Sequence, residues 1–221
     1  MLGGMDWVEW HAGYDDPGSR LAHRLRIVRE QIRASLDRPP PGPVTVISLC
    51  AGQGRDVIEV LASHPRRADV RARLVELDPR NAGAATAAAR SAGLSGVEAV
   101  VGDAGLADEY AGLVPADLVV ACGVFGNLTD ADVQRTAAAC AALTRAGGTV
   151  VWTRHRGAPD RVPAVCSLLE ERGFERLFLT PPELGFGVGA HRQTRSPTAM
   201  EPGTRMFTFV GGDILRARLD P

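Results

Sequence analysis

The stretch VTVISLCAGQGRDVIEV, residues 44–60, decides the fold. It begins with the β-branched and apolar residues of a buried strand, and from Gly54 onward it has the spacing of an amphipathic helix. Gly52 and Gly54 lie between the two elements. Glycine lets the backbone come close to a ligand, and the N-terminus of the next helix offers free N–H groups. We therefore predict a ligand site at this turn.

The rest of the chain alternates between strand-like and helix-like segments. Short Val-, Ile- and Leu-rich runs bounded by turn residues are typical of strands, and longer runs with apolar residues three or four apart are typical of helices. This alternation predicts an α/β fold with a doubly wound, mostly parallel sheet and helices on both faces. We expect strands at 44–49, 70–78, 97–103, 116–124, 147–155, 174–180 and 204–211, and helices at 15–37, 54–63, 79–93, 130–147 and 158–173.

The last two expected strands have no helix between them. Strands joined in this way pair antiparallel, so we expect a hairpin at one edge of the sheet. The intervening stretch GFGVGAHRQTRSP, residues 185–197, is rich in glycine and is expected to be a loop that covers the substrate.

The linker RPPPGP, residues 38–43, marks the clearest internal boundary. It divides the chain into an N-terminal helical lid segment, residues 1–43, and a main domain, residues 44–221. Dense aromatic residues before the first helix, Tyr14 among them, motivate the lid. The alternative is that these aromatic residues hold the helix against the sheet.

The composition excludes several classes of function. The formal net charge is −1, so no strong basic field is available to gather nucleic acid, and we expect no nucleic-acid partner. All 25 basic residues are arginine, which excludes a lysine Schiff base and a phosphate-binding loop that ends in Gly-Lys. Neither a monomer nor a homodimer is favoured.

The cysteines and the apolar runs bear on location. Cys50, Cys122, Cys140 and Cys166 lack Cys-x-x-Cys spacing, so we predict no metal site. Their apolar surroundings fit reduced thiols in a cytoplasmic protein. The start of the chain lacks the pattern of a signal peptide, and no apolar run has the length of a bilayer, so we expect no membrane association.

Acidic residues follow the second and third expected strands. In such a sheet, ligands bind beyond the carboxyl ends of the strands. Glu76 follows Gly54 at about the 20-residue spacing expected of an acid that accepts both hydroxyls of a ribose. Asp103, at the next strand end, is placed to accept from an adenine amino group. Together these residues predict an adenosine site.

Five segments, in this order, resemble the class I S-adenosylmethionine-dependent methyltransferases. The resemblance covers about residues 44–210 and implies the Rossmann-like fold of that family, a seven-stranded sheet of order 3-2-1-4-5-7-6 whose last strand is antiparallel. The segments are SLCAGQG (48–54), VELDP (75–79), VGDAG (101–105), ADLVVACGVFGNL (116–128) and GGTVVWT (147–153).

The resemblance also implies S-adenosyl-L-methionine as cofactor and a role for each segment. The glycine-rich turn meets the methionine part, Glu76 takes the ribose, Asp103 takes the adenine, and the segment after the fourth strand borders the methyl group. The implied cofactor-binding residues are Cys50, Ala51, Gly52, Gly54, Glu76, Leu77, Asp103, Ala104, Cys122, Gly123 and Asn127.

Two positions depart from the family pattern. The family usually has an acid where Ser48 stands and a glycine where Cys50 stands. A cysteine side chain disfavours a positive φ at that position, so we expect weakened cofactor contacts there. Asp78 either caps the second helix of the main domain or contacts the cofactor. Asp56 is expected to favour the dipole of the helix that it begins.

Four residues are candidates for catalysis. His155, at the end of the fifth expected strand, is a candidate general base, and a structural hydrogen bond is the alternative. His11 is a second candidate base, and His191, in the expected loop, is a weaker third. Tyr14 can offer an aromatic face or a hydroxyl, since aromatic faces attract a sulfonium cation. The pair Tyr14–Asp15 also resembles one found in small-molecule members of the family.

The favoured function is methyl transfer to an oxygen or nitrogen of a small molecule. Two alternatives stay open: an NAD(P)-dependent oxidoreductase, and an S-adenosylmethionine-binding protein without activity. An RNA substrate is disfavoured because the sequence offers no basic face.

Overall fold

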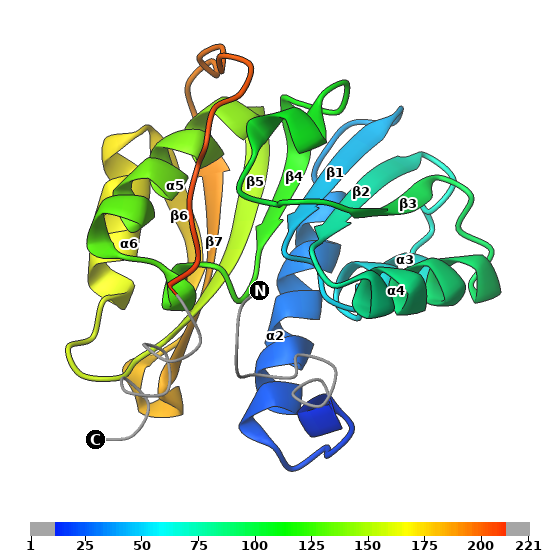
Figure 1. Ribbon diagram of the computed structural model, residues 1–221, viewed down its shortest axis with the longest axis horizontal. Helices are drawn as coiled ribbons and strands as arrows, with labels where there is room; N and C mark the ends of the chain where they lie inside the picture. Colours follow the sequence, from blue (N-terminus) through cyan, green and yellow to red (C-terminus); the bar gives the residue numbers. More distant parts are fainter. Residues whose placement is uncertain (1–11, 211–221) are drawn as a thin grey trace.

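The computed structural model describes residues 12–210, which form one seven-stranded sheet covered on both faces (Figure 1). The strand order is β3-β2-β1-β4-β5-β7-β6, and β7 runs antiparallel to both of its neighbours. The predicted fold class is therefore confirmed. The strands are β1 Val44–Leu49, β2 Val70–Glu76, β3 Val97–Val101, β4 Ala116–Ala121, β5 Thr144–His155, β6 Phe174–Leu179 and β7 Phe186–Gln193.

Helices cover the sheet in two layers with separate apolar cores. Side chains of α2, α3 and α4 share one core, and those of α5 and α6 share the other. The α-helices are α2 Arg20–Leu36, α3 Val57–Ser63, α4 Pro79–Ser91, α5 Asp130–Leu143 and α6 Val162–Glu171, and the short 3-10 helices are η1 Ala12–Tyr14, η2 Ala107–Tyr110, η3 Phe125–Asn127 and η4 Pro182–Leu184.

Helix α2 belongs to the sheet-covering layer. The Ser19 hydroxyl accepts from the Ala22 N–H at 3.0 Å and so caps the helix. Val28, Ile32 and Leu36 are spaced four residues apart and are buried against the sheet. The division into a lid over residues 1–43 and a domain over residues 44–221 stays a prediction.

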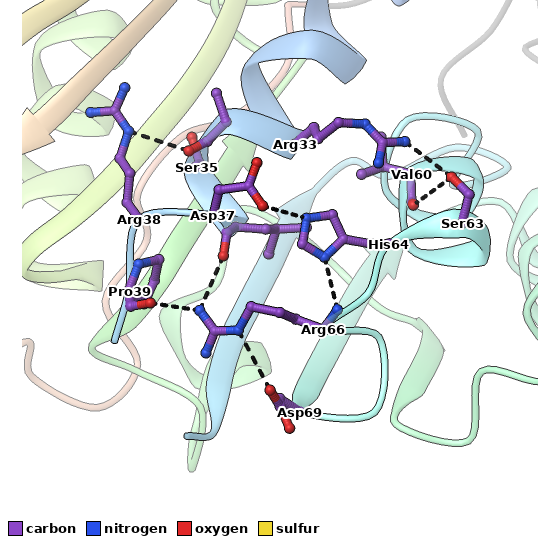
Figure 2. A network of polar contacts seen from close by, with 12 residues as sticks. Arg33, Ser35, Asp37, Arg38, Pro39, Val60, Ser63, His64, Arg66 and Asp69 are labelled. Atoms are coloured by element: carbon purple, nitrogen blue, oxygen red, sulfur yellow. Dashed lines mark hydrogen bonds and ion pairs between the residues drawn. The ribbon is translucent and has the colours of Figure 1, made fainter. Parts of the chain in front are cut away.

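A polar network holds the linker after α2 at the amino ends of β1 and β2 (Figure 2). The guanidinium of Arg66 donates to four backbone carbonyls, at distances of 2.7 to 3.2 Å. His64 accepts from the Arg66 N–H at 3.2 Å, and its Nε2 lies 3.2 Å from a carboxylate oxygen of Asp37. Arg66 therefore clamps the proline-rich linker. The four carbonyls belong to Leu36, Pro39, Pro40 and Gly42.

The prediction of the last strand was wrong. Residues 204–211 were expected to form it, whereas the strand is β7, inside the stretch that was expected to be a loop. Gly187 and Gly189 suggested a loop, but they let bulky neighbours pack on the backbone of β7. A Cβ atom at Gly189 would lie 2.3 Å from the ring of Trp152, and one at Gly187 would lie 2.7 Å from Val162.

Residues 200–210, which we call the C-terminal strap, cover part of the face that carries α5 and α6. Figure 1 shows this segment in red alongside α5. Met206 and Phe207 are buried in the core on that face. Every residue between β3 and β4 is described, and this connection contains the short helix η2 and no α-helix. The strap therefore completes this layer beside β3 and β4.

Candidate functional site

The glycine-rich turn and the end of β2 are joined through Glu76. One carboxylate oxygen of Glu76 accepts from the Gly52 N–H at 2.8 Å, and the other accepts from the Asp78 N–H at 2.9 Å. Gly52 and Gly54 both have positive φ, at 55° and 68°, so the turn needs glycine at these positions. Each oxygen of Glu76 keeps a second lone pair with which it can accept from a ligand.

Cys50 adopts the conformation that its side chain was expected to disfavour. Its φ is 52°. Weakened cofactor contacts at this position stay a prediction. The Ala51 N–H donates to the Val75 carbonyl at 3.0 Å, and this bond holds the turn in place. Burial, with the nearby charges of Glu76 and Asp103, raises the pKa of the Cys50 thiol well above its usual range. The thiol is therefore neutral and packs as an apolar group.

Asp103 follows β3 and is held on both of its oxygens. One accepts from the Gly105 N–H and the other from Arg205 of the C-terminal strap, each at 2.9 Å. Ala104 beside it is buried. Leu77, after β2, and Val101, at the end of β3, are each 57% exposed and are the exposed large hydrophobic residues of the described chain. An apolar surface thus lies at the strand ends that carry Glu76 and Asp103.

The end of β4 is tied to the end of β5. The Gly123 N–H donates to the Thr153 hydroxyl at 2.8 Å, and the Asn127 side chain donates to the Gly123 carbonyl at 2.7 Å. Cys122, just before, is half-buried. Burial and the charge of Asp56 raise the pKa of its thiol well above the usual range. Cys122 is therefore a neutral wall of the site rather than a nucleophile.

Tyr14 and α2 approach this end of the sheet from the N-terminal side. Burial raises the pKa of Tyr14, and its hydroxyl accepts from Arg24 over a long 3.4 Å. The Arg55 guanidinium lies 5.9 Å from the centre of the Tyr14 ring and bonds Asp15 at 2.5 Å. The start of the described chain is therefore attached to the glycine-rich turn. Whether Tyr14 faces a sulfonium stays a prediction.

His155 is placed at the end of β5, and its Nδ1 is held by the backbone. Its Nδ1 accepts from the Gly157 N–H at 3.0 Å, which leaves the proton of the neutral ring on Nε2. Partial burial and the charge of Arg154 lower its pKa, and a hydrogen bond to the Gly126 carbonyl opposes the shift. The role of His155 as a base stays a prediction, and His11 lies outside the described residues.

His191 lies in a strand, whereas the sequence analysis placed it in a loop. It lies in β7 and is fully buried, with its Nδ1 accepting from the Trp152 indole N–H at 3.1 Å. Burial and the charge of Arg176 lower its pKa to about 4. The prediction of a loop base was wrong because residue 191 packs inside the sheet.

Several site residues were missed by the sequence analysis. Asn81 is 1% exposed, and its Oδ1 accepts from Gln53 of the glycine-rich turn at 3.3 Å. Its Nδ2 has no hydrogen-bond partner between residues 12 and 210. The position of Gln53 between two glycines was a usable signal, but Asn81 carried none. Asp78, whose two alternatives stayed open, accepts from the Arg80 N–H at 2.9 Å as the cap of α4.

Metal clusters and membrane-spanning helices are both absent from the described residues. No group of three or more His, Cys, Asp or Glu side chains there could hold a metal ion. Among the helices of residues 12–210, none is long and apolar enough to cross a bilayer.

The fold and the strand-end residues define a class I methyltransferase, and the comparisons agree. A family model named Methyltransf_20, described as "Putative methyltransferase", matches residues 18–169. The chain therefore belongs to this methyltransferase family, and the predicted resemblance to S-adenosylmethionine-dependent enzymes is confirmed. No curated protein sequence matches the chain.

Solved structures of methyltransferases share the fold. A 1,6-didemethyltoxoflavin-N1-methyltransferase from Burkholderia thailandensis, with S-adenosylhomocysteine bound, has a TM-score of 0.60 at 19% identity over 86% of this chain and 87% of that chain. A TehB-like S-adenosylmethionine-dependent methyltransferase from Corynebacterium glutamicum has a TM-score of 0.55 at 19% identity, over 78% and 95%. An RNA methyltransferase from Salinibacter ruber, with S-adenosylhomocysteine bound, has a TM-score of 0.51 at 20% identity, over 80% and 96%.

Proposed function

We propose that this enzyme transfers a methyl group from S-adenosyl-L-methionine to an oxygen or nitrogen of a small molecule. The observation that carries the proposal is the Glu76 carboxylate, which is held between the glycine-rich turn and the end of β2 with lone pairs to spare. Asp103 follows the neighbouring strand, so two acceptors lie along one edge of the sheet. Their separation along that edge suits a ribose and a base.

Unused donors and an apolar surface near the strand ends support the proposed cofactor. The side-chain nitrogen of Asn81 is a buried donor without a partner in the described chain, and it lies beside the glycine-rich turn. The one hydrogen bond of Arg24 within residues 12–210 is the long contact to Tyr14, which leaves its guanidinium able to bind a carboxylate. Leu77 and Val101 offer an apolar surface to the adenine.

Each of these groups has a separate task. When bound, the cofactor would supply an electrophilic methyl carbon for in-line attack by the acceptor, with S-adenosylhomocysteine as the leaving group. Glu76 accepts from the ribose hydroxyls, Asp103 accepts from the adenine amino group, and Arg24 binds the methionine carboxylate. Cys50 and Cys122, as neutral thiols, keep water from the sulfur end, which favours a step in which positive charge disappears.

A small-molecule acceptor is favoured over RNA. The net charge of −1 gives little attraction for a polyanion. The toxoflavin enzyme, which acts on a small molecule, shares the fold at a TM-score of 0.60, whereas the RNA methyltransferase shares it at 0.51. The free thiols at all four cysteine positions are consistent with the cytoplasmic location that we propose.

Calorimetry with S-adenosylhomocysteine tests the first half of the proposal. We expect saturable binding with one site per chain, and the absence of binding would reject the proposed cofactor site. Transfer from labelled S-adenosylmethionine, assayed in parallel with a small-molecule extract and with total RNA, tests the second half. Label in RNA alone would reject the small-molecule acceptor. Label in neither fraction would favour the alternative of a binding protein without activity.

A further inference from the structure

The C-terminal strap makes its polar contacts with the loops that follow β3 and β4. Its hydrogen bonds to the rest of the described chain reach residues 103–108 and Asn127. The Val210 N–H donates to the Asn127 carbonyl at 2.9 Å, and the Gly203 N–H donates to the Asp108 carboxylate at 2.9 Å. The strap thus connects the loop that we assign to the adenine with the segment that we assign to the methyl group.

The backbone of the strap is anchored without help from the Arg205 side chain. The Met206 N–H donates to the Gly105 carbonyl at 2.8 Å, and the Ala107 N–H donates to the Thr204 carbonyl at 3.0 Å. A Cβ atom at Gly105 would lie 2.4 Å from the Phe207 carbonyl oxygen, so the two backbones touch there. Met206 and Phe207 are buried. Removing the Arg205 side chain should therefore leave the strap in place.

Outside the strap, the Arg205 side chain bonds the carboxylate of Asp103, and within the strap it makes a longer contact of 3.4 Å to the Phe207 carbonyl. It donates to the Oδ2 atom at 2.9 Å, while the Gly105 N–H donates to the Oδ1 atom at 2.9 Å. With a donor on each oxygen, the plane of the carboxylate is fixed, and each oxygen keeps one lone pair for a ligand. Without Arg205, the carboxylate would have a single donor and could rotate.

We propose that Arg205 is a positioning residue of the adenine subsite, which sets the orientation of Asp103 from a distant part of the chain. This inference rests on the proposed function, because it requires the adenine amino group to bind at Asp103. The strap is then part of the cofactor site as well as part of the core. Selectivity for a 6-amino purine should depend on it, because a carboxylate with an aimed lone pair accepts from an amino group more strongly than a rotating one, while it gains nothing from a carbonyl.

The test compares two ligands on each variant by calorimetry. S-adenosylhomocysteine carries the 6-amino group, and S-inosylhomocysteine carries a carbonyl in its place. The native protein should prefer the first. In Arg205→Met we expect affinity for S-adenosylhomocysteine to fall about fivefold, as for one exposed charged contact, with little change for the inosine compound. Arg205→Lys should restore part of the preference, because it keeps the charge.

Arg192→Met is the matched control, because Arg192 also forms an exposed ion pair, with Glu175, on the hairpin of β6 and β7. It should change neither affinity. If Arg205→Met keeps the native preference, or weakens both ligands equally, the inference is overturned while the proposed function stands. If the native protein binds neither ligand, the proposed function itself fails. Thermal melting of each variant separates a folding defect from a loss of selectivity.

Discussion

The amino and carboxyl ends of the parallel strands differ in how fully their polar groups are paired. At the amino end, Arg66 donates to four carbonyls and lies 3.5 Å from Asp69, and the linker is fixed (Figure 2). At the carboxyl end, within residues 12–210, the Asn81 side-chain nitrogen has no partner, and Arg24 makes one long contact. Other buried side-chain atoms of residues 12–210, such as His191 Nε2, also lack a hydrogen-bond partner. The unused donors of Asn81 and Arg24, however, lie at the end of the sheet where ligands bind in such folds, so they indicate a ligand there.

Removal of the amino-end clamp should have the largest effect on stability. Arg66→Ala deprives four backbone carbonyls of their donor, and we expect the free energy of unfolding to fall by about 3 to 4 kcal/mol. Urea denaturation measures this change. Affinity for S-adenosylhomocysteine, measured on the folded variant, should stay within about twofold of native because the clamp is remote from the strand ends that bind it.

Arg71→Ala is the matched control for the clamp, since Arg71 is an exposed arginine on the nearby strand β2. It should change the unfolding free energy by no more than about 0.5 kcal/mol. If Arg66→Ala has native stability, whether or not its affinity for S-adenosylhomocysteine is lost, the two ends are not specialised in this way.

Acid sensitivity should belong to the middle of the sheet, where His191 of β7 pairs with Val150 of β5. The pKa of His191 is lowered from 6.5 to about 4, so between these values the unfolded chain binds a proton that the native protein does not. Stability is therefore lost as the pH falls from 6.5 to 4, by about 3 kcal/mol at most. In His191→Asn, the free energy of unfolding should change less with pH across this range than it does in the native protein.

His155→Asn gives the comparison at the carboxyl end. The pKa of His155 is also lowered, but this residue is exposed, so solvent reduces its contribution. We expect the acid dependence of stability to be nearly native in this variant. Equal flattening in both variants would place the acid-sensitive group elsewhere.

At the carboxyl end, the largest effect on binding should come from Glu76. Glu76→Ala removes the predicted ribose acceptor and also frees the Gly52 N–H of the glycine-rich turn. Loss of two or more charged hydrogen bonds should weaken S-adenosylhomocysteine about 50- to 100-fold. Calorimetry measures this loss, and Glu98→Ala, which removes an exposed acid of β3 paired with Arg73, is the control. An unchanged affinity in Glu76→Ala would move the cofactor away from this edge.

A feature of the fold could be predicted when neighbouring residues in the sequence carry its signal. Most of the strands were predictable because runs of Val, Ile and Leu between turn residues report burial directly. The place of Glu76 and Asp103 at strand ends was predictable in the same way, and their roles stay predictions. β7 was missed because Gly187 and Gly189 resemble a loop until Val162 and Trp152 pack on them. Such packing depends on residues that only the folded chain brings together.

The same reasoning explains the gaps in the site. Arg205 lies 102 residues from Asp103, and nothing near either residue in the sequence marks the pair. The partner of Asn81 is Gln53, at the end of another strand. The positive φ of Cys50 contradicts the local preference of a side chain, because the backbone bond from Ala51 to Val75 holds the turn. These contacts come from tertiary structure, which local patterns do not encode.

A smaller effect than that of Glu76 is predicted for Arg24, and it tests whether the unused donors at the carboxyl end bind a carboxylate. Arg24→Met should weaken S-adenosylhomocysteine about tenfold, the value of one charge-assisted pair. It should leave 5′-methylthioadenosine unchanged, because that ligand lacks the methionine carboxylate. Arg20→Met, one turn earlier on α2, should affect neither ligand, since Arg20 is exposed and donates to the Leu184 carbonyl. Equal weakening of both ligands would mean that Arg24 supports Tyr14 rather than binding the cofactor, and its unused donors would then face the acceptor.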